Sequence, residues 1–448
     1  MTENDAPRGV RQRLGRLLRR ARNCLRQPHP LAELISLAAE HEVRWPAYVI
    51  AQNYAAWQAA RVPSWENGRF RLRFHWRALK GGCSALWRSV APGGPGSFHE
   101  VKVRQPPRAG APEVLHVIPT LLVGGSQKVL FDLVEELGHA YRMRVLTGWL
   151  PHFGRYPGLD VTVARTVEAV AKDLRERPPA LIHLHYLGME PFTRTFLDAL
   201  ERLPEMRAPI LENNNMPVQA LAHPRVAHCV HVSRYAMDLQ SHPAGAHSVI
   251  YPGVSPEHFP PRPAQRPAGP PTVGMVYRLA TEKLNLASIE PFIEVARRMP
   301  EARILIVGEG LYLAPYVARV KDAGVRAQFH FAGRLSYRDL PACYDRMDVF
   351  LAPVYEESYG VVVPYALCKG VPVLAYRVGA LPEMLGEADC FCADAQDMAA
   401  RAVGLLKDPE SARRLGARLR ERAGRFSLAG MAAAYDRLYT SLLRPTQA

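Results

Sequence analysis

Residues 356–385 read EESYGVVVPYALCKGVPVLAYRVGALPEML, and this stretch carries the pattern of a loop, a helix, a strand and a second helix. The preceding DVFLAP is an apolar run of strand type, so Glu356 and Glu357 fall in the loop that follows it. Gly360 opens the helical VVVPYALCKG, VPVLAY is the next strand, and Gly379 turns the chain into the helical LPEML. Strands and helices that alternate in this way are typical of a parallel sheet.

The same alternation runs through most of the chain, in two blocks. The first begins at Glu113 and the second at TVGMVYRL, and between them residues 256–271 contain seven prolines and form an interdomain connection. A chain of 448 residues is also longer than one core usually supports. We therefore predict an α/β protein with two doubly wound, Rossmann-like domains facing a cleft, at residues 111–255 and, with terminal helices, 272–448.

The N-terminal 110 residues differ in texture and form a basic, mainly helical extension that ends in a linker. This extension has 19 Lys and Arg against 7 Asp and Glu, so it carries +12 of the net charge of +15. Residues 8–27 place apolar side chains three and four apart among eight arginines, which predicts a basic amphipathic helix. Such a helix binds an anionic membrane surface or packs on the protein with solvated arginines, and the sequence leaves both open. Nucleic acid is less favoured as its partner, because no recognised binding module accompanies the basic run.

The overall composition is that of a globular protein, with 48% hydrophobic and 22% charged residues. The seven cysteines are scattered without metal-ligand spacing, so we expect a reducing compartment and no metal site. No apolar segment resembles a signal peptide or a spanning helix. We expect a cytoplasmic protein, with peripheral contact to the inner face of the membrane if the extension binds lipid.

Several polar and glycine positions fall where the strands of such sheets end. Gly124 and Gly125 follow the first strand and open a helix, where backbone amides approach an anion or merely allow a tight turn. Arg278 and Lys283 follow the first strand of the second domain, and two cations there suit a diphosphate. After DVFLAP, a carboxylate is placed to bind sugar hydroxyls and the amides of residues 358–361 to meet a phosphate. Together these features predict a site for a diphosphate sugar.

At these residues the chain resembles the retaining GT-B glycosyltransferases of family 4. The resemblance covers about 70% of the chain, from about residue 113 to 430, and leaves the extension outside. It rests on an ordered set of motifs: VGGSQ, RLATEK, VGEG, EESYG, ALCKG, GVPV and GALPE.

The resemblance implies roles for these residues. Arg278 and Lys283 hold the diphosphate and assist its departure without a metal, and Glu357 contacts the transferred sugar. No cofactor is implied, since the nucleotide sugar is a co-substrate. The further donor-binding positions that the resemblance implies are Gly124, Gly125, Gly333, Arg334, Leu335, Ser358, Tyr359 and Gly360.

The sequence departs from the family pattern at two places. The family's second glutamate, which binds ribose, is replaced by Tyr365, whose phenol is a weaker acceptor. A histidine that often follows the strand PILENNN is replaced by asparagines, of which Asn213 and Asn215 are candidate acceptor or sugar contacts. His183 and His185 are the nearest imidazoles by topology, either as substrate contacts or as strand-end packing.

The resemblance implies a metal-independent retaining glycosyltransferase that moves a sugar to a glycan or lipid-linked acceptor, in cell-surface polysaccharide or lipopolysaccharide synthesis. The alternative is a GT-B protein with weakened catalysis that serves as a binding or scaffolding subunit of a glycan-assembly complex. Tyr365 favours this alternative, whereas Arg278, Lys283 and Glu357 favour catalysis.

Overall fold

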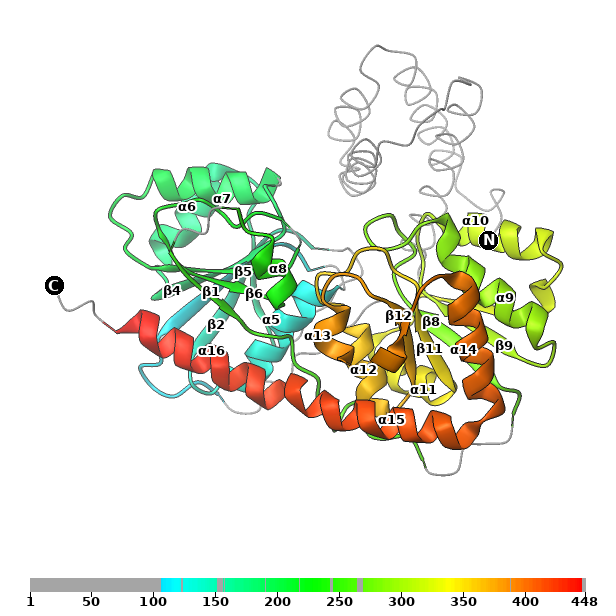
Figure 1. Cartoon of the computed structure of the whole chain (residues 1–448). Coiled ribbons are helices and arrows are strands. Elements are labelled where there is room, and N and C mark those ends of the chain that lie inside the picture. Colours follow the sequence, from blue (N-terminus) through cyan, green and yellow to red (C-terminus); the bar gives the residue numbers. More distant parts are fainter. Residues whose placement is uncertain are drawn as a thin grey trace, which may run out of the picture. The chain divides into compact units, whose positions relative to one another are not determined.

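The computed structural model (Figure 1) describes residues 106–444, apart from 122–123, 151–155, 157, 190, 217, 242–244, 264–268 and 387. The predicted basic helix at residues 8–27 and the extension up to residue 105 lie outside the described residues, as does part of the proline-rich connection. Within the described ranges, no helix has both the length and the apolar character needed to cross a bilayer.

The first domain is a seven-stranded parallel sheet with the strand order β3-β2-β1-β4-β5-β6-β7. Its strands are β1 (Glu113–Thr120), β2 (Arg142–Trp149), β3 (Asp160–Val163), β4 (Leu181–Tyr186), β5 (Ile210–Asn214), β6 (Val226–His231) and β7 (Ala246–Val249). The helices between them are α5 (Gly125–Leu137), α6 (Val167–Glu176), α7 (Pro191–Glu201) and α8 (Arg234–Asp238). The strand order reverses between β1 and β4. Such a reversal is a topological switch point, where ligands of parallel sheets bind outside the carboxyl ends of the strands.

The second domain is a six-stranded parallel sheet with the order β10-β9-β8-β11-β12-β13. Its strands are β8 (Thr272–Val276), β9 (Arg303–Val307), β10 (Phe329–Gly333), β11 (Val349–Ala352), β12 (Val373–Tyr376) and β13 (Phe391–Cys392). The α-helices are α9 (Glu290–Arg298), α10 (Leu313–Asp322), α11 (Leu340–Asp345), α12 (Val362–Lys369), α13 (Leu381–Leu385), α14 (Ala395–Lys407), α15 (Pro409–Ala423) and α16 (Leu428–Leu443). The two parallel α/β sheets predicted from the alternating pattern are thus confirmed.

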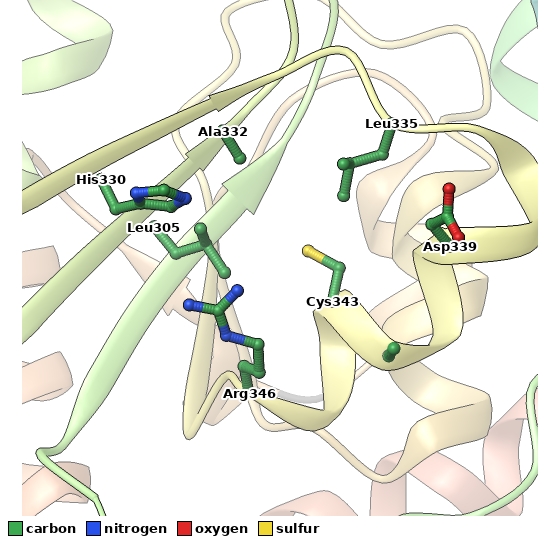
Figure 2. A pocket seen from close by; sticks show the side chains of 8 residues that line it. Leu305, His330, Ala332, Leu335, Asp339, Cys343 and Arg346 are labelled. Carbon is green, nitrogen blue, oxygen red and sulfur yellow. The ribbon is translucent and has the colours of Figure 1, made fainter. Parts of the chain in front are cut away.

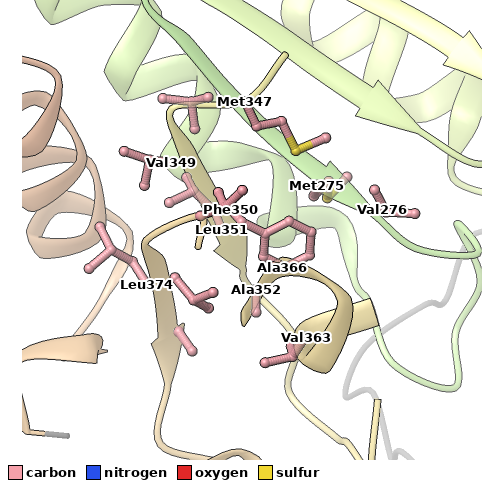
Figure 3. Close-up of a cluster of buried hydrophobic side chains, with 14 of the residues drawn as sticks. Met275, Val276, Met347, Val349, Phe350, Leu351, Ala352, Val363, Ala366 and Leu374 are labelled. Atoms are coloured by element: carbon pink, nitrogen blue, oxygen red, sulfur yellow. The ribbon is translucent and has the colours of Figure 1, made fainter. Parts of the chain in front are cut away.

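The core of the second domain explains why the quoted stretch folds as it does. β11 is buried along its whole length, and its side chains pack with those of β8, α12 and β12 (Figure 3). A strand buried on both faces has to be continuously apolar, as VFLA is. The buried strand therefore fixes where the following loop, Glu356 to Gly360, emerges at the edge of the sheet.

The C-terminal helix α16 joins the core of the first sheet, although the sequence groups it with residues 272–448. It lies along α5 (Figure 1). Its side chains in the first core are Leu428, Met431, Ala432, Tyr435 and Tyr439. The partner of an amphipathic helix is set by tertiary contacts, and sequence spacing alone does not reveal it.

Candidate functional site

Lys283 and Glu357 form an ion pair at the carboxyl ends of β8 and β11. Lys283 Nζ lies 2.6 Å from Glu357 Oε1, and the carboxylate is 0% exposed while the lysine side chain is 29% exposed. The backbone supports the pair, because Tyr355 N donates to Lys283 O at 3.0 Å. Two residues 74 positions apart are thereby joined where the sequence predicted a diphosphate and a sugar.

The other carboxylate oxygen of Glu357 is buried without a partner. Among the described residues, neither Glu357 Oε2 nor the nearby hydroxyl of Tyr277 has a hydrogen-bond partner. Burial and, secondarily, the charge of Glu357 raise the pKa of Tyr277 well above its usual range. Buried polar atoms are normally paired, so these two atoms are exceptions that call for a partner.

Two glycines shape the backbone around Glu357. Gly360 has φ +78°, and a Cβ there would lie 2.5 Å from Glu357 Oε2. Gly379 has φ +52°, and its Cβ would lie 2.1 Å from Glu357 O. Residues with a side chain rarely adopt such φ values, and a Cβ at either position would clash with Glu357. Glycine is therefore required at both positions. Ala380 N also donates to Glu357 O at 2.9 Å, so the start of α13 holds the glutamate in place.

The remaining predicted diphosphate and base residues lie at the same edge of the second sheet. Arg278 follows β8 and is exposed, and Gly333, Arg334 and Leu335 end β10 or follow it. The loops are tied together, since Leu279 N donates to Glu309 O at 2.9 Å and Gly308 N to Gly333 O at 2.8 Å. Ligands of such sheets bind outside the carboxyl ends of the strands, where these residues lie.

A hollow of about 270 Å³ opens between β10 and α11 (Figure 2). Leu335 is part of its wall, together with His330, Asp339, Cys343 and Arg346. Neither Lys283 nor Glu357 lines it. Of the predicted site residues, it therefore reaches only Leu335, and we do not equate it with the sugar site.

Tyr365 lies inside the protein rather than at an open surface. Its side chain is 3% exposed, and its ring stacks on Phe259 with centroids 4.1 Å apart and planes at 6°. Burial raises its pKa, and Tyr337 is a hydrogen-bonding neighbour. The position of the family's ribose-binding glutamate is thus occupied by part of an aromatic stack.

The predicted residues of the loop before α12 are placed next to Glu357. Ser358, Tyr359 and Gly360 are buried, and Val361 caps α12, one residue later than the sequence predicted. The hydroxyl of Tyr359 donates to Pro252 O at 2.7 Å, so this side chain anchors the loop.

In the first domain, Gly124 and Gly125 stand at the start of α5 as predicted. Gly124 is the N-cap residue with an extended backbone, and Gly125 is exposed as the first helical residue. Asn213 lies in β5 and Asn215 follows it, and Asn213 Nδ2 donates to Asn215 Oδ1 at 2.9 Å. Asn213 also accepts from the hydroxyl of Tyr435 at 2.6 Å, so α16 holds this asparagine.

His183 and His185 are fully buried in a cluster with His116 of β1. His183 Nδ1 lies 2.6 Å from the hydroxyl of Tyr439, and His185 Nε2 lies 3.0 Å from His116 Nδ1. In this structure both residues pack in the core beneath α16. The sequence analysis missed His116, although its place on the strand beside β4 puts it level with His183.

The three imidazoles lie close together and form hydrogen bonds, and their ligand nitrogens lie within 4.8 Å of one another. The ring centroids of His116 and His185 are 5.3 Å apart while their nearest nitrogens are 3.0 Å apart. The two nitrogens therefore lie nearly in line between the rings, as in an N–H···N bond. His183 and His185 are stacked, with ring centroids 4.4 Å apart and planes at 19°.

Comparison with known proteins supports the interpretation of the second domain. Residues 259–422 match the family model described as glycosyl transferases group 1. A 2-deoxystreptamine glucosyltransferase of Streptomyces kanamyceticus is 34% identical over 27% of this chain and 31% of its own length. A GDP-mannose-dependent alpha-(1-6)-phosphatidylinositol monomannoside mannosyltransferase of Mycolicibacterium smegmatis is 32% identical over 39% of this chain and 50% of its own length. The chain thus spans at most half the length of these two relatives.

Solved structures share the fold across both domains. Anabaena Alr3699/HepE, in complex with UDP and glucose, aligns with a TM-score of 0.62 and 16% identity over 74% of this chain and 100% of its own. Sucrose-phosphate synthase from Thermosynechococcus elongatus aligns with a TM-score of 0.59 and 19% identity over 74% and 99%. At such identities the likeness establishes the fold alone. The chain therefore has two parallel Rossmann-like sheets of the GT-B fold, and residues 259–422 of its second domain match the glycosyl transferases group 1 model.

Proposed function

We propose that the protein is a metal-independent retaining glycosyltransferase that moves a sugar from a nucleoside diphosphate sugar to a glycan or lipid-linked acceptor. The observation that carries the proposal is the Lys283–Glu357 pair with its buried, unpartnered carboxylate oxygen. A carboxylate with one oxygen paired to a lysine and the other without a partner suits a sugar hydroxyl, because the hydroxyl supplies the missing donor.

In this proposal Arg278 and Lys283 bind the diphosphate. Cations at the edge of the second sheet neutralise the charge that grows on the leaving group as the glycosidic bond breaks. The amides of Ser358, Tyr359 and Gly360 supply further donors before α12. Glu357 orients the transferred sugar, so the acceptor attacks from the face that the leaving group occupies and the departing phosphate takes its proton.

The donor-binding set is completed by positions on both sheets. Gly333, Arg334 and Leu335 border the base, Gly124 and Gly125 approach the diphosphate or acceptor, and Asn213 and Asn215 lie on the acceptor side. Tyr365 contributes through packing at the ribose position. A UDP complex of one structural neighbour and the GDP-mannose dependence of one relative support a nucleotide donor and leave its base open.

We further propose an acceptor in cell-surface polysaccharide or lipopolysaccharide synthesis. One relative is a phosphatidylinositol monomannoside mannosyltransferase, and one structural neighbour is a lipopolysaccharide outer core galactosyltransferase with a TM-score of 0.53. The basic segment at residues 8–27 remains a predicted contact to an anionic membrane surface.

The proposal is tested by release of nucleoside diphosphate from UDP-glucose and GDP-mannose, with cell-envelope glycolipids as acceptors. We expect one donor to be turned over, and Arg278→Ala to lower the rate by about 10², the scale of removing one preorganised donor group. Arg319→Ala is the matched control, because this surface arginine is 48% exposed and pairs with Glu290. An Arg278→Ala rate equal to that of the wild type would contradict the proposal.

A further inference from the structure

Glu383, on the short helix α13, accepts three hydrogen bonds from the segments around β6 and β7. Its carboxylate accepts from the amides of Arg234 at 2.9 Å and Tyr235 at 2.7 Å, and from the hydroxyl of Tyr251 at 2.7 Å. These amides belong to the first turn of α8, which has no acidic residue of its own there. A carboxylate that accepts several N–H and O–H bonds is a strong, orienting anchor.

A second set of bonds joins the start of α8 to the loop that carries Glu357. Ser233 is fully buried, caps α8 by accepting from Ala236 N at 3.0 Å, and donates to Ser358 O at 2.5 Å. The hydroxyl of Tyr235 donates to Glu356 Oε1 at 2.9 Å. The start of α8 therefore holds the residues on both sides of Glu357.

The turn into α13 also contacts Glu357 directly. Glu357 O accepts from Ala380 N at 2.9 Å and is packed against Gly379, at the turn into α13. Glu383 is three residues further along the same turn of chain. The start of α8 is thus bonded to α13 through Glu383 and to the Glu357 loop through Ser233. The loop is in turn bonded to the start of α13 through Ala380 N.

We propose that Glu383 and Ser233 are positioning residues that set the geometry of Glu357 through the start of α8. The inference rests on the proposed function for its catalytic consequence. Donor binding and the contacts of α8 are then coupled. Loss of the α8 contacts lowers the affinity for the donor, and bound donor stabilises the α8 contacts by the same factor. Glu383 is the last residue of the GALPE motif, so in this proposal the motif positions the Glu357 loop.

The structural half of the proposal is tested by amide hydrogen exchange without any ligand. In Glu383→Gln and in Ser233→Ala, exchange at residues 356–360 is expected to rise about tenfold, together with exchange at residues 234–238. Tyr251→Phe removes only the hydroxyl that donates to Glu383, so it serves as the test if the other variants unfold. The control is Asp408→Ala, which removes the cap that accepts from Ser411 N at 3.0 Å at the start of α15, so it lowers stability elsewhere. Faster exchange at residues 234–238 alone, or an equal rise at residues 356–360 in Asp408→Ala, would overturn the proposal.

The functional half uses UDP and GDP as probes, measured by titration calorimetry. We expect the diphosphate that binds the wild type to bind Glu383→Gln about tenfold more weakly, with Asp408→Ala unchanged. Unaltered affinity in a variant with loosened residues 356–360 would overturn the coupling. If neither UDP nor GDP binds the wild type, the proposed function fails at its first step, and the exchange experiment still decides whether α8 sets the Glu357 loop.

Discussion

Replacing Lys283 with methionine is expected to lower donor turnover by about 10² and the free energy of unfolding by about 2–3 kcal/mol. The first effect follows from loss of a cation at the diphosphate. The second follows because Glu357 is 0% exposed and would keep a buried charge without its partner. The stability loss is set at the low end for a broken buried pair, since Lys283 is 29% exposed and water screens part of its charge.

The double variant Lys283→Met with Glu357→Gln separates these two effects. Removing the orphaned charge should restore most of the lost stability, whereas turnover should stay low because neither the cation nor the carboxylate remains. Chemical denaturation and a turnover assay on the same preparations measure both. Equal stabilities for the single and the double variant would contradict the claim that Glu357 without Lys283 destabilises the fold.

Lowering the pH from 7.5 to 5.5 is expected to remove about 4 kcal/mol of unfolding free energy through the three buried imidazoles. Burial lowers the pKa of His116 to about 3, and burial followed by the neighbouring imidazoles lowers the pKa of His183 well below its usual value. Burial also lowers the pKa of His185 in the same way. Each stays neutral in the folded protein but takes up a proton on unfolding below its ordinary pKa of about 6.5. Stability from this source is therefore present above pH 6.5 and is lost as the pH falls.

Two buried carboxyl groups change the free energy of unfolding in the opposite direction over this pH range. Burial raises the pKa of Glu212 to about 7 and that of Asp132 to about 6, so both take up protons in the folded state over this range. These two groups offset part of the loss, whereas His231, whose pKa burial lowers to about 4, adds to it. The test therefore compares a variant with the wild type. We expect His183→Gln to lessen the loss between pH 7.5 and 5.5 by about 1.4 kcal/mol, with exposed His139→Gln as the matched control. Identical pH dependence in the wild type and in His183→Gln would contradict the account.

The sequence predicted the two parallel sheets and the placement of the candidate residues at the edge of the second sheet, because those features depend on local patterns. Apolar runs such as VFLA mark buried strands, and the loop after such a strand emerges at the ligand edge. Lys283 and Glu357 could therefore be singled out from their positions after two strands. Their direct ion pair could not, since it joins residues 74 positions apart.

Features that depend on packing between distant segments were beyond the sequence. The stacking of Tyr365 on Phe259 spans 106 positions and replaces a carboxylate by an aromatic pair. His116 lacks any motif, and only the pairing of β1 with β4 brings it to His183. Glu383 was noted within GALPE, but its partners at α8 follow from tertiary structure alone.

The central claim is that the edge of the second sheet around Arg278, Lys283 and Glu357 binds a nucleoside diphosphate. It is tested most directly by thermal and denaturant unfolding of the wild type and Arg278→Ala with UDP, GDP and ADP. At about a hundred times its dissociation constant, the matching diphosphate should add about 2.7 kcal/mol to the wild type and distinctly less to Arg278→Ala. Stabilisation by none of the three diphosphates, or the same stabilisation in both proteins, would contradict the claim.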